Sequence, residues 1–357
     1  MKALVTANLN ERSRRRLEDD LGIDVDYRPI EDRETRLPEA DVIDALEGVD
    51  IFVVGFEGVS EAVLDAAEDL ALVACARGGP DANVDISAAA DRGIPVLYAP
   101  GRNAVSVADF TVGLMIDVAR NISHSHHLLQ TGTYTGEPRA DTTGGGERED
   151  VTWGSGKGSP YVELKGSELA DKTVGIVGFG AIGRAVTDRV RGFEVEMLAM
   201  DPYVSADEMP EDVEKADLDD LCARSDFVTV HVPVTDATRG LVGRAEFEAM
   251  KDSAFFINTA RGAIIDQDAL VEHLQANELG GAALDVYDRE PLPEDHVLLE
   301  LDRVVTTPHL AGAAREVIDR HSEMLVDDIA AILDGREPDH VADTGALPLT
   351  ELAGGVH

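Results

Sequence analysis

Length, composition and charge bound what this chain can be. Its 357 residues are enough for two domains of ordinary size, and 44% of them are hydrophobic, so each domain can bury its own core. Asp and Glu total 70 against 31 Lys and Arg, which gives a formal net charge of -39. Such a chain repels nucleic acid and anionic membranes, and it has no apolar run long enough to span a bilayer.

The acidic residues are spread along the whole sequence, and only six of the basic residues are Lys. This composition resembles the surface of proteins from salt-accumulating halophiles, where ~1 M salt cuts the screening length to about 3 Å and makes the repulsion tolerable. The N-terminus begins like a strand and lacks the apolar stretch of a signal peptide, so we expect a cytoplasmic protein.

The first hundred residues alternate between strand-like and helix-like segments, which predicts a parallel sheet with helices on its faces. Amphipathic stretches at residues 60–70 and 85–93 predict helices, the second ending at Gly93 as a helix C-cap. Short apolar runs predict strands at residues 2–7, 50–55, 71–76 and 95–100.

One long helical pattern covers residues 103–129, and a Gly- and Thr-rich segment, residues 131–160, then predicts a surface loop or insertion. A second series of alternating strand-like and helix-like segments follows, and its strand number and spacing are typical of a doubly wound nucleotide-binding sheet. The candidate strands of this series are residues 172–179, 194–201, 226–232, 253–260, 281–286 and 303–308. A last helix is predicted over residues 313–333.

Two clusters that could suggest a metal are better explained otherwise. Cys75 and Cys222 lie in apolar surroundings, which favours two buried free thiols over a disulfide or a metal pair. The "HSHH" run, His124 to His127, has no carboxylate or Cys partners in register, which favours a surface or subunit-contact role. We therefore expect no metal site.

A glycine fingerprint, G-x-G-x-x-G, follows the first strand of the second series and opens an amphipathic helix. Gly178 allows the tight turn, Gly180 lets the backbone approach a pyrophosphate, and Gly183 lets helix and strand pack closely. Ala181 and Ile182 lie at the helix N-terminus, whose N–H groups favour phosphates. These residues predict a dinucleotide site.

Asp201 ends the next strand, 18 residues beyond Gly183. A carboxylate there accepts hydrogen bonds from the adenosine ribose hydroxyls and repels a 2′-phosphate, which favours NAD over NADP. The simpler interpretation is a turn residue before Pro202.

Four more polar residues follow later strands. "INTARG" holds Arg261, "LDVYDREP" holds Asp285 and Glu290, and "TTPHLAG" holds His309. Ligands of open α/β sheets bind beyond the carboxyl ends of the strands, so all four can face the crevice of the glycine loop. Taken singly, each could be a structural ion pair, a turn residue or a helix cap.

In this order, the glycine fingerprint, the "TARG" arginine, the "D-V-x-x-x-E-P" block and the "P-H-x-A-G" histidine resemble the D-isomer-specific 2-hydroxyacid dehydrogenase family. The resemblance covers residues 40–335, and it includes the segment 231–243. It implies a Rossmann-type cofactor domain and a flavodoxin-like substrate domain with a cleft between them. The domains would be residues 103–311 for the cofactor, and residues 1–102 with 312–357 for the substrate.

The family resemblance also implies roles. His309 would be the acid/base, and Glu290 would pair with it, because a neighbouring carboxylate stabilises imidazolium. Arg261 would bind the substrate carboxylate through a charge-assisted fork, and Asp285 would orient the nicotinamide through its carboxamide. Further cofactor contacts would come from His231, Val232, Pro233, Thr238, Thr259, Ala260, His309 and Gly312.

On the substrate side, the matching loop offers Gly78 and Gly79, whose N–H groups can approach an anion. Arg77 would help hold that anion or would form a surface salt bridge. Pro80 has no N–H and departs from the usual family donors. The segment 53–61 should line the pocket for the substrate side chain. It offers Phe56 and Glu57 but no Lys or Arg that would bind a phosphate group.

A phosphorylated substrate is therefore disfavoured, and a small 2-oxo acid such as glyoxylate, hydroxypyruvate or pyruvate is expected. Phosphoglycerate dehydrogenase is the nearest alternative, and an NAD-sensing binding protein is an alternative of another class. The resemblance also implies a homodimer through the region 103–129.

The charge generates a first prediction. Raising KCl from dilute to molar should raise the melting temperature, because screening relieves repulsion among the acidic side chains. Thermal melts followed by circular dichroism at the two salt concentrations measure this. An unchanged melting temperature would remove the halophilic interpretation.

Overall fold

A computed structural model describes residues 1–135 and 157–342. The chain divides into two compact units, one of Met1–Asn103 with Ala313–His357 and one of Ala104–Gly312. Most of the predicted insertion at 131–160 lies outside the described residues, and so does the tail beyond residue 342.

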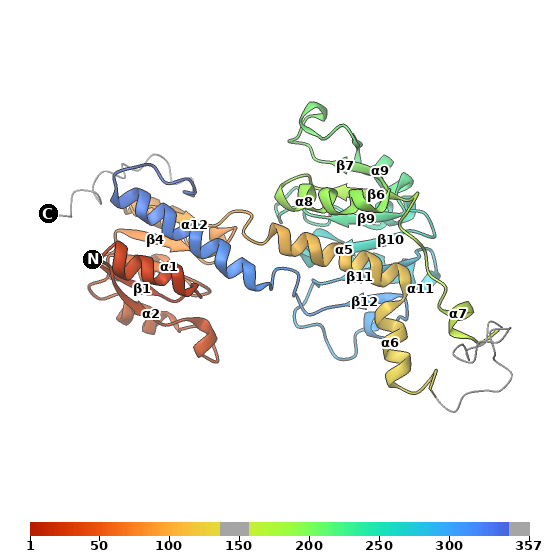
Figure 1. Cartoon of the computed structure of the whole chain (residues 1–357), viewed down its shortest axis with the longest axis horizontal. Coiled ribbons are helices and arrows are strands. Elements are labelled where there is room, and N and C mark those ends of the chain that lie inside the picture. The colour runs from red at the N-terminus through yellow and green to blue at the C-terminus, as the bar shows by residue number, and fades with distance from the viewer. Residues whose placement is uncertain (136–156, 343–357) are drawn as a thin grey trace, which may run out of the picture. The chain divides into compact units, whose positions relative to one another are not determined.

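The N-terminal unit contains a five-stranded parallel sheet in the order β2-β1-β3-β4-β5. Figure 1 labels β1 and β4 of this sheet. This order is that of flavodoxin-like folds, in which the topology switches between β1 and β3. The strands are β1 (Lys2–Val5), β2 (Asp24–Tyr27), β3 (Ile51–Val54), β4 (Leu72–Cys75) and β5 (Val96–Tyr98).

Helices cover both faces of this sheet because alternate strand residues point to opposite sides. Leu4, Phe52 and Val73 pack against α2 to α4, whereas Ala3 and Val53 lie in a cluster with α12 and with Leu17, which follows α1. The helices are α1 (Glu11–Arg15), α2 (Glu39–Ala45), α3 (Glu61–Ala66), α4 (Ile86–Asp91) and α12 (Arg315–Leu333).

The second unit contains a seven-stranded parallel sheet in the order β12-β11-β10-β9-β6-β7-β8. Read from β8, this is the doubly wound Rossmann order with one added strand. The strands are β6 (Thr173–Val177), β7 (Glu196–Met200), β8 (Val213–Lys215), β9 (Phe227–Val230), β10 (Phe255–Asn258), β11 (Gly281–Leu284) and β12 (Val304–Thr306).

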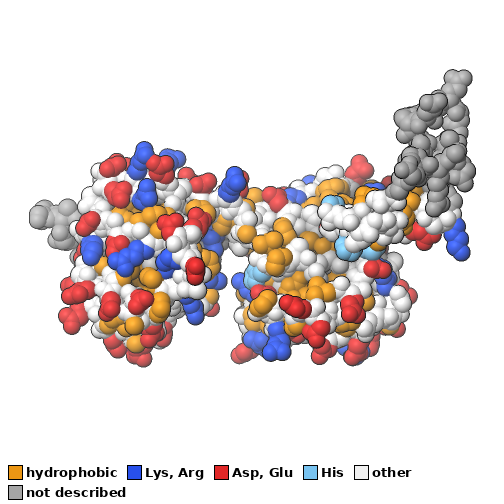
Figure 2. Space-filling model, turned by 90° about the horizontal axis from the view of Figure 1, so that it is seen from below, with side chains coloured by type: hydrophobic (Ala, Val, Ile, Leu, Met, Phe, Trp, Pro, Cys, Tyr) orange, Lys and Arg blue, Asp and Glu red, His pale blue; other side chains and the backbone are white. Residues whose placement is uncertain are grey.

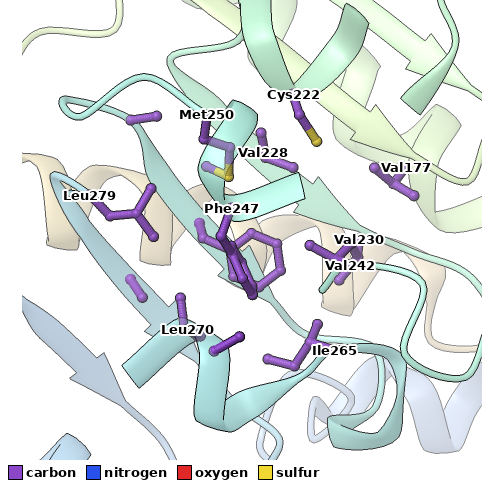
Figure 3. Close-up of a cluster of buried hydrophobic side chains, with 14 of the residues drawn as sticks. Val177, Cys222, Val228, Val230, Val242, Phe247, Met250, Ile265, Leu270 and Leu279 are labelled. Carbon is purple, nitrogen blue, oxygen red and sulfur yellow. The ribbon is translucent and has the colours of Figure 1, made fainter. Parts of the chain in front are cut away.

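Its two faces are also covered. Ile176 and Ile257 pack with α5 and α8, while Val228 and Phe256 lie in a core cluster around Phe247 with α9 to α11 (Figure 3). The helices are α5 (Ala104–Arg120), α6 (Ile122–Gln130), α7 (Pro160–Glu163), α8 (Ala181–Val190), α9 (Leu218–Arg224), α10 (Arg244–Ala249) and α11 (Gln267–Ala276).

The predicted fold class is confirmed, as are the buried free thiols of Cys75 and Cys222. Burial raises the pKa of these two thiols to about 11 and about 12, so neither is a ready nucleophile. Two strands were missing from the prediction, β2 and β8. Both are edge strands with mixed polar sequences and partial exposure, so neither forms an apolar run.

The single helix predicted over 103–129 was wrong, because Asn121 interrupts it. Asn121 has a left-handed backbone (φ 56°), which Asn tolerates better than most residues, and its side chain donates to the carbonyl of Leu164. The chain therefore turns there, and α6 begins a new direction after α5.

Asp and Glu side chains are spread over the visible faces of both units (Figure 2), as the composition requires. Among the residues that the structure describes, no helix is both long and apolar enough to cross a bilayer. In the same part of the chain, no group of three or more His, Cys, Asp or Glu is arranged to hold a metal ion.

Candidate active site

His309 and Glu290 form a hydrogen-bonded pair beyond the carboxyl ends of β11 and β12. The Nδ1 atom of His309 lies 2.7 Å from Oε2 of Glu290. Because an ionised carboxylate only accepts, Nδ1 carries the hydrogen, and Nε2 is left as the ring atom for proton exchange. The other oxygen, Oε1, accepts from the N–H of Tyr287 at 3.1 Å, which fixes the carboxylate.

The charge state of Glu290 follows from these contacts. Partial burial alone would raise the pKa of Glu290, but it is outweighed by the hydrogen bonds from His309 and the Tyr287 N–H. The positive charges of His309 and Arg261 act in the same direction, so the pKa of Glu290 lies below its usual value. Glu290 is therefore an anion that accepts the hydrogen bond of His309.

Asp285 fixes the segment 307–311, which contains His309, through hydrogen bonds. Its fully buried carboxylate accepts the Thr307 hydroxyl at 2.6 Å and the N–H groups of Leu310 and Ala311 at 2.7 and 2.8 Å. Its backbone carbonyl accepts the N–H of His309 at 2.9 Å. Together these hydrogen bonds stabilise a turn in which His309 has a positive φ of 58°, a backbone conformation that is unfavourable for a residue with a side chain. Contact of Asp285 with nicotinamide stays a prediction.

Arg261 lies on the neighbouring loop after β10. Buried Asn258 holds this loop, since its amide donates to the Arg261 carbonyl and its oxygen accepts the Ala260 N–H, both at 3.0 Å. A Cβ on Gly262 would lie 2.1 Å from the backbone of Tyr287. Only glycine lets the Arg261 loop and the Glu290 loop approach this closely, which brings the two charges near each other.

A cavity of about 550 Å³ opens beside the pair. His309 and Glu290 contribute its ionisable pair, Thr306 and Thr307 add hydroxyls, and Leu292, Leu299 and Pro308 are among the apolar residues of the lining. This combination of an apolar wall with a few convergent polar groups is typical of small-molecule sites.

The glycine loop has the geometry that a pyrophosphate requires. Gly178 has φ 96°, and an added Cβ at Gly183 would lie 2.1 Å from the Gly178 carbonyl oxygen, so both positions exclude other residues. At Gly180, by contrast, a Cβ would meet nothing within 4 Å. Gly180 starts α8 without a side-chain cap, so Ala181 and Ile182 lie in a first turn whose N–H groups are open to a phosphate.

Asp201 lies beside this loop. Its Oδ2 accepts the N–H of Phe179 at 2.8 Å and its Oδ1 accepts that of Tyr203 at 2.9 Å, which orients the carboxylate next to the fingerprint. Contact of Asp201 with a ribose stays a prediction.

The other predicted cofactor residues lie around the strand ends of the same unit. Buried His231 packs its backbone against Gly178, and burial lowers the pKa of His231 to about 3, so its ring is neutral. Thr259 is hydrogen-bonded to Thr111 at 2.9 Å. The remaining predicted contacts lie in the segments that follow β9 (Val232, Pro233 and Thr238), β10 (Ala260) and β12 (Gly312).

In the N-terminal unit, Gly78 and Gly79 are exposed beyond β4, and the Arg77 guanidinium lies 5.5 Å from the ring centre of Phe56. The expectation that Glu57 lines a substrate pocket was wrong. Glu57 is fully buried and pairs with Arg33 at 2.9 Å, because a buried carboxylate needs a cation and donors.

Comparison with known proteins decides the family. The family described as "D-isomer specific 2-hydroxyacid dehydrogenase, NAD binding domain" matches residues 112–311. The chain is 37% identical to a putative 2-hydroxyacid dehydrogenase of Bacillus subtilis over 328 residues, which cover 91% of this chain and 89% of that one. The chain belongs to the D-isomer-specific 2-hydroxyacid dehydrogenase family.

Other members of the family resemble this dehydrogenase almost as closely. A glyoxylate reductase of Thermofilum pendens is 36% identical, with 81% of this chain and 80% of that one covered. A D-3-phosphoglycerate dehydrogenase of Archaeoglobus fulgidus is 35% identical over 94% of this chain, which spans only 58% of that longer protein. In structure, the TT0316 protein of Thermus thermophilus gives a TM-score of 0.79 at 31% identity, over 96% of this chain and all of the other.

Three residues that organise the dehydrogenase site were not singled out from the sequence. Asn258 is a polar residue at the end of an apolar strand, which is a signal that could have found it. Gly262 lies inside the "TARG" motif. Tyr287 lies inside the "LDVYDREP" block, and its hydroxyl donates to the carbonyl oxygens of Leu284 and Thr307, both at 3.0 Å.

The pair predicts a loss of rate when its anion is removed. In Glu290→Gln, kcat/KM for 2-oxo acid reduction should fall about 10-fold or more across the pH range, because the His309 ring loses its charge-assisted hydrogen bond. The lowered pKa of Glu290 keeps the wild-type carboxylate ionised even at pH values below the usual Glu range, so wild type retains this bond there. The pH profile of kcat/KM measures the effect.

Glu294→Gln, an exposed neighbour in the same loop, is the matched control and should leave the profile unchanged. If Glu290→Gln gave the wild-type profile, the hydrogen bond of Glu290 to His309 would not contribute to the reaction.

Proposed function

We propose that this dehydrogenase transfers hydride between NAD(H) and a small 2-oxo or 2-hydroxy acid, with His309 as the acid/base. The observation that carries the proposal is the 2.7 Å hydrogen bond between His309 and Glu290, with Arg261 close by on a loop that Gly262 and Asn258 hold in place. His309 and Glu290 also line a cavity of about 550 Å³, a size typical of small-molecule sites.

In the direction of reduction, the Arg261 guanidinium binds the substrate carboxylate and polarises the adjacent carbonyl. The bound cofactor supplies hydride from nicotinamide C4 to the carbonyl carbon. His309 gives a proton from Nε2 to the carbonyl oxygen, while Glu290 stabilises the ring until that transfer. Oxidation reverses the transfers, with neutral His309 accepting the hydroxyl proton.

The cofactor would be held by this chain's glycine loop. The open space at Gly180 and the uncapped first turn of α8 suit a pyrophosphate. The carboxylate of Asp201 would accept the ribose hydroxyls and repel a 2′-phosphate, which favours NAD over NADP.

The substrate is proposed to be an unphosphorylated 2-oxo acid such as glyoxylate, hydroxypyruvate or pyruvate. A relative of 36% identity is a glyoxylate reductase, and Arg33, the base that lies near residue 57, is already paired with Glu57. Phosphoglycerate dehydrogenase is the alternative, favoured by the 35% identity to such an enzyme.

Steady-state rates on a panel of 2-oxo acids with NADH and with NADPH test the assignment. We expect the highest kcat/KM with a small unphosphorylated acid and NADH. A preference for 3-phosphohydroxypyruvate would select the alternative, and a lower KM for NADPH than for NADH would overturn the role of Asp201.

Replacing His309 tests the acid/base. His309→Gln should lower kcat for reduction by about 10²- to 10⁴-fold, because the proton donor is lost. The affinity for NADH, measured by fluorescence titration, should stay near that of wild type and shows that the variant is folded. Retention of most of the turnover would refute the role.

We also propose that the protein forms a homodimer through the region 103–129. We propose further that it works in the cytoplasm at high salt concentration. Ile122 and Leu129 are each 51% exposed on α6, and such apolar side chains favour a covered surface. Light scattering at molar KCl should give twice the monomer mass, and a monomer mass would refute the dimer.

A further inference from the structure

Apolar side chains line the cavity that borders His309 and Glu290. Leu292 and Leu299 belong to this lining, and the cavity has a volume of about 550 Å³. Leu299 is 50% exposed. A single exposed leucine is unremarkable on a protein surface, but here it faces a hollow next to an ionisable pair, which is where an apolar part of a ligand would be covered.

The two leucines are fixed by the core of the same unit. Leu298 is buried in the core cluster, and its N–H donates to Nδ1 of His296 at 3.2 Å. Leu299 is the next residue of the same 3₁₀ turn, η7 (Val297–Leu299), in which successive side chains point in different directions. Leu292 packs against the same cluster. The apolar lining is therefore preformed.

The polar groups of the lining are bonded within the protein. The Tyr287 hydroxyl donates to the Thr307 carbonyl oxygen at 3.0 Å, and the Thr307 hydroxyl donates to Asp285 at 2.6 Å. The Thr306 hydroxyl is hydrogen-bonded to that of Tyr287, and both oxygens of Glu290 already accept a hydrogen bond. A ligand hydroxyl in this cavity would have to compete with these bonds, and burying it unpaired costs free energy.

The charge of the cavity disfavours a second anion. Among the described residues that line it, none is Lys or Arg, and Glu290 is an anion. Even a protonated His309 is already paired with Glu290 at 2.7 Å. A carboxylate or phosphate at the end of a substrate side chain would lose its hydration there and gain no free cation.

The reaction geometry decides which part of a substrate reaches the cavity. The carbonyl carbon of a 2-oxo acid carries three groups: its oxygen, its carboxylate and its side chain. In the proposed reaction the oxygen lies at Nε2 of His309 and the carboxylate binds Arg261. Arg261 is not among the described residues that line the cavity, whereas His309 is. The group left for the cavity is the side chain.

We propose that this cavity holds the side chain of the 2-oxo acid, that Leu292 and Leu299 are specificity-determining residues, and that the preferred substrates carry a short apolar side chain. This inference rests on the proposed function and narrows it to pyruvate and its longer homologues. Glyoxylate has no side chain and would leave the cavity to water, at about 30 Å³ a molecule.

A matched pair of substrates tests the inference on the full-length wild type with NADH. 2-Oxobutanoate and hydroxypyruvate differ only in a terminal methyl against a hydroxyl. We expect kcat/KM to be about 10-fold or more higher for 2-oxobutanoate, because the cavity offers the hydroxyl no open partner. From pyruvate through 2-oxobutanoate to 2-oxopentanoate, kcat/KM should rise about fourfold per carbon, the factor expected for burying one methylene.

A charge introduced into the lining should redirect specificity. In Leu299→Arg, the kcat/KM for 2-oxoglutarate relative to that for 2-oxobutanoate should rise about 10-fold or more, because the new cation pairs with the second carboxylate. A residue with a merely structural role would lower both values together. Phe193→Arg is the matched control, since Phe193 is exposed in the same unit but does not line the cavity, and its ratio should equal that of wild type.

If Leu299→Arg does not fold, Leu299→Ala serves in its place. This variant removes part of the apolar lining, so it should lower kcat/KM for 2-oxopentanoate several-fold more than for pyruvate.

The outcomes separate this inference from the proposed function. Equal kcat/KM values for 2-oxobutanoate and hydroxypyruvate, or a wild-type ratio in Leu299→Arg, would overturn the inference and leave the proposed function standing, because 2-oxo acids are still reduced. A preference for 3-phosphohydroxypyruvate would also overturn it. Reduction of no 2-oxo acid would refute the proposed function, and the inference with it.

Discussion

The buried carboxylate of Asp285 is the constraint on which the geometry of the candidate active site depends. It is fully buried, and it is satisfied only because three donors of the segment 307–311 converge on it. A buried carboxylate without donors is costly, so the same bonds that neutralise this cost also fix the turn of His309. The imidazole thereby reaches Glu290, whose Oε2 atom lies 2.7 Å from Nδ1 of the ring.

Parallel topology explains why residues distant in sequence meet. β10, β11 and β12 are neighbours in one sheet, so the loops after them, with Arg261, Glu290 and His309, emerge at the same edge. Topology alone does not set the distances. Gly262 lets two loops touch, and Tyr287 ties the ends of β11 and β12 together through its hydroxyl. Gly262 and the buried Tyr287 therefore set how closely the loops of Arg261, Glu290 and His309 approach one another.

Sequence patterns predicted the fold class because its signals are local: apolar runs of strand length, amphipathic helices between them, and a glycine fingerprint in the expected context. Edge strands β2 and β8 escaped because exposed strands need no apolar run. Glu57 was misplaced because its direction depends on Arg33, which lies 24 residues earlier in the chain. The bond between Arg102 and His321 joins residues 219 positions apart, and nothing local to either residue indicates it.

A double-mutant cycle on kcat/KM for 2-oxo acid reduction measures whether Glu290 acts through His309. Glu290→Gln would be measured in wild type and in the His309→Gln background at one pH and salt concentration. We expect a large loss in wild type and almost no further loss when His309 is already gone, because the carboxylate then has no ring to stabilise. Losses that multiply in the double variant would show that the two residues act independently and would refute the role of Glu290 as the partner of His309.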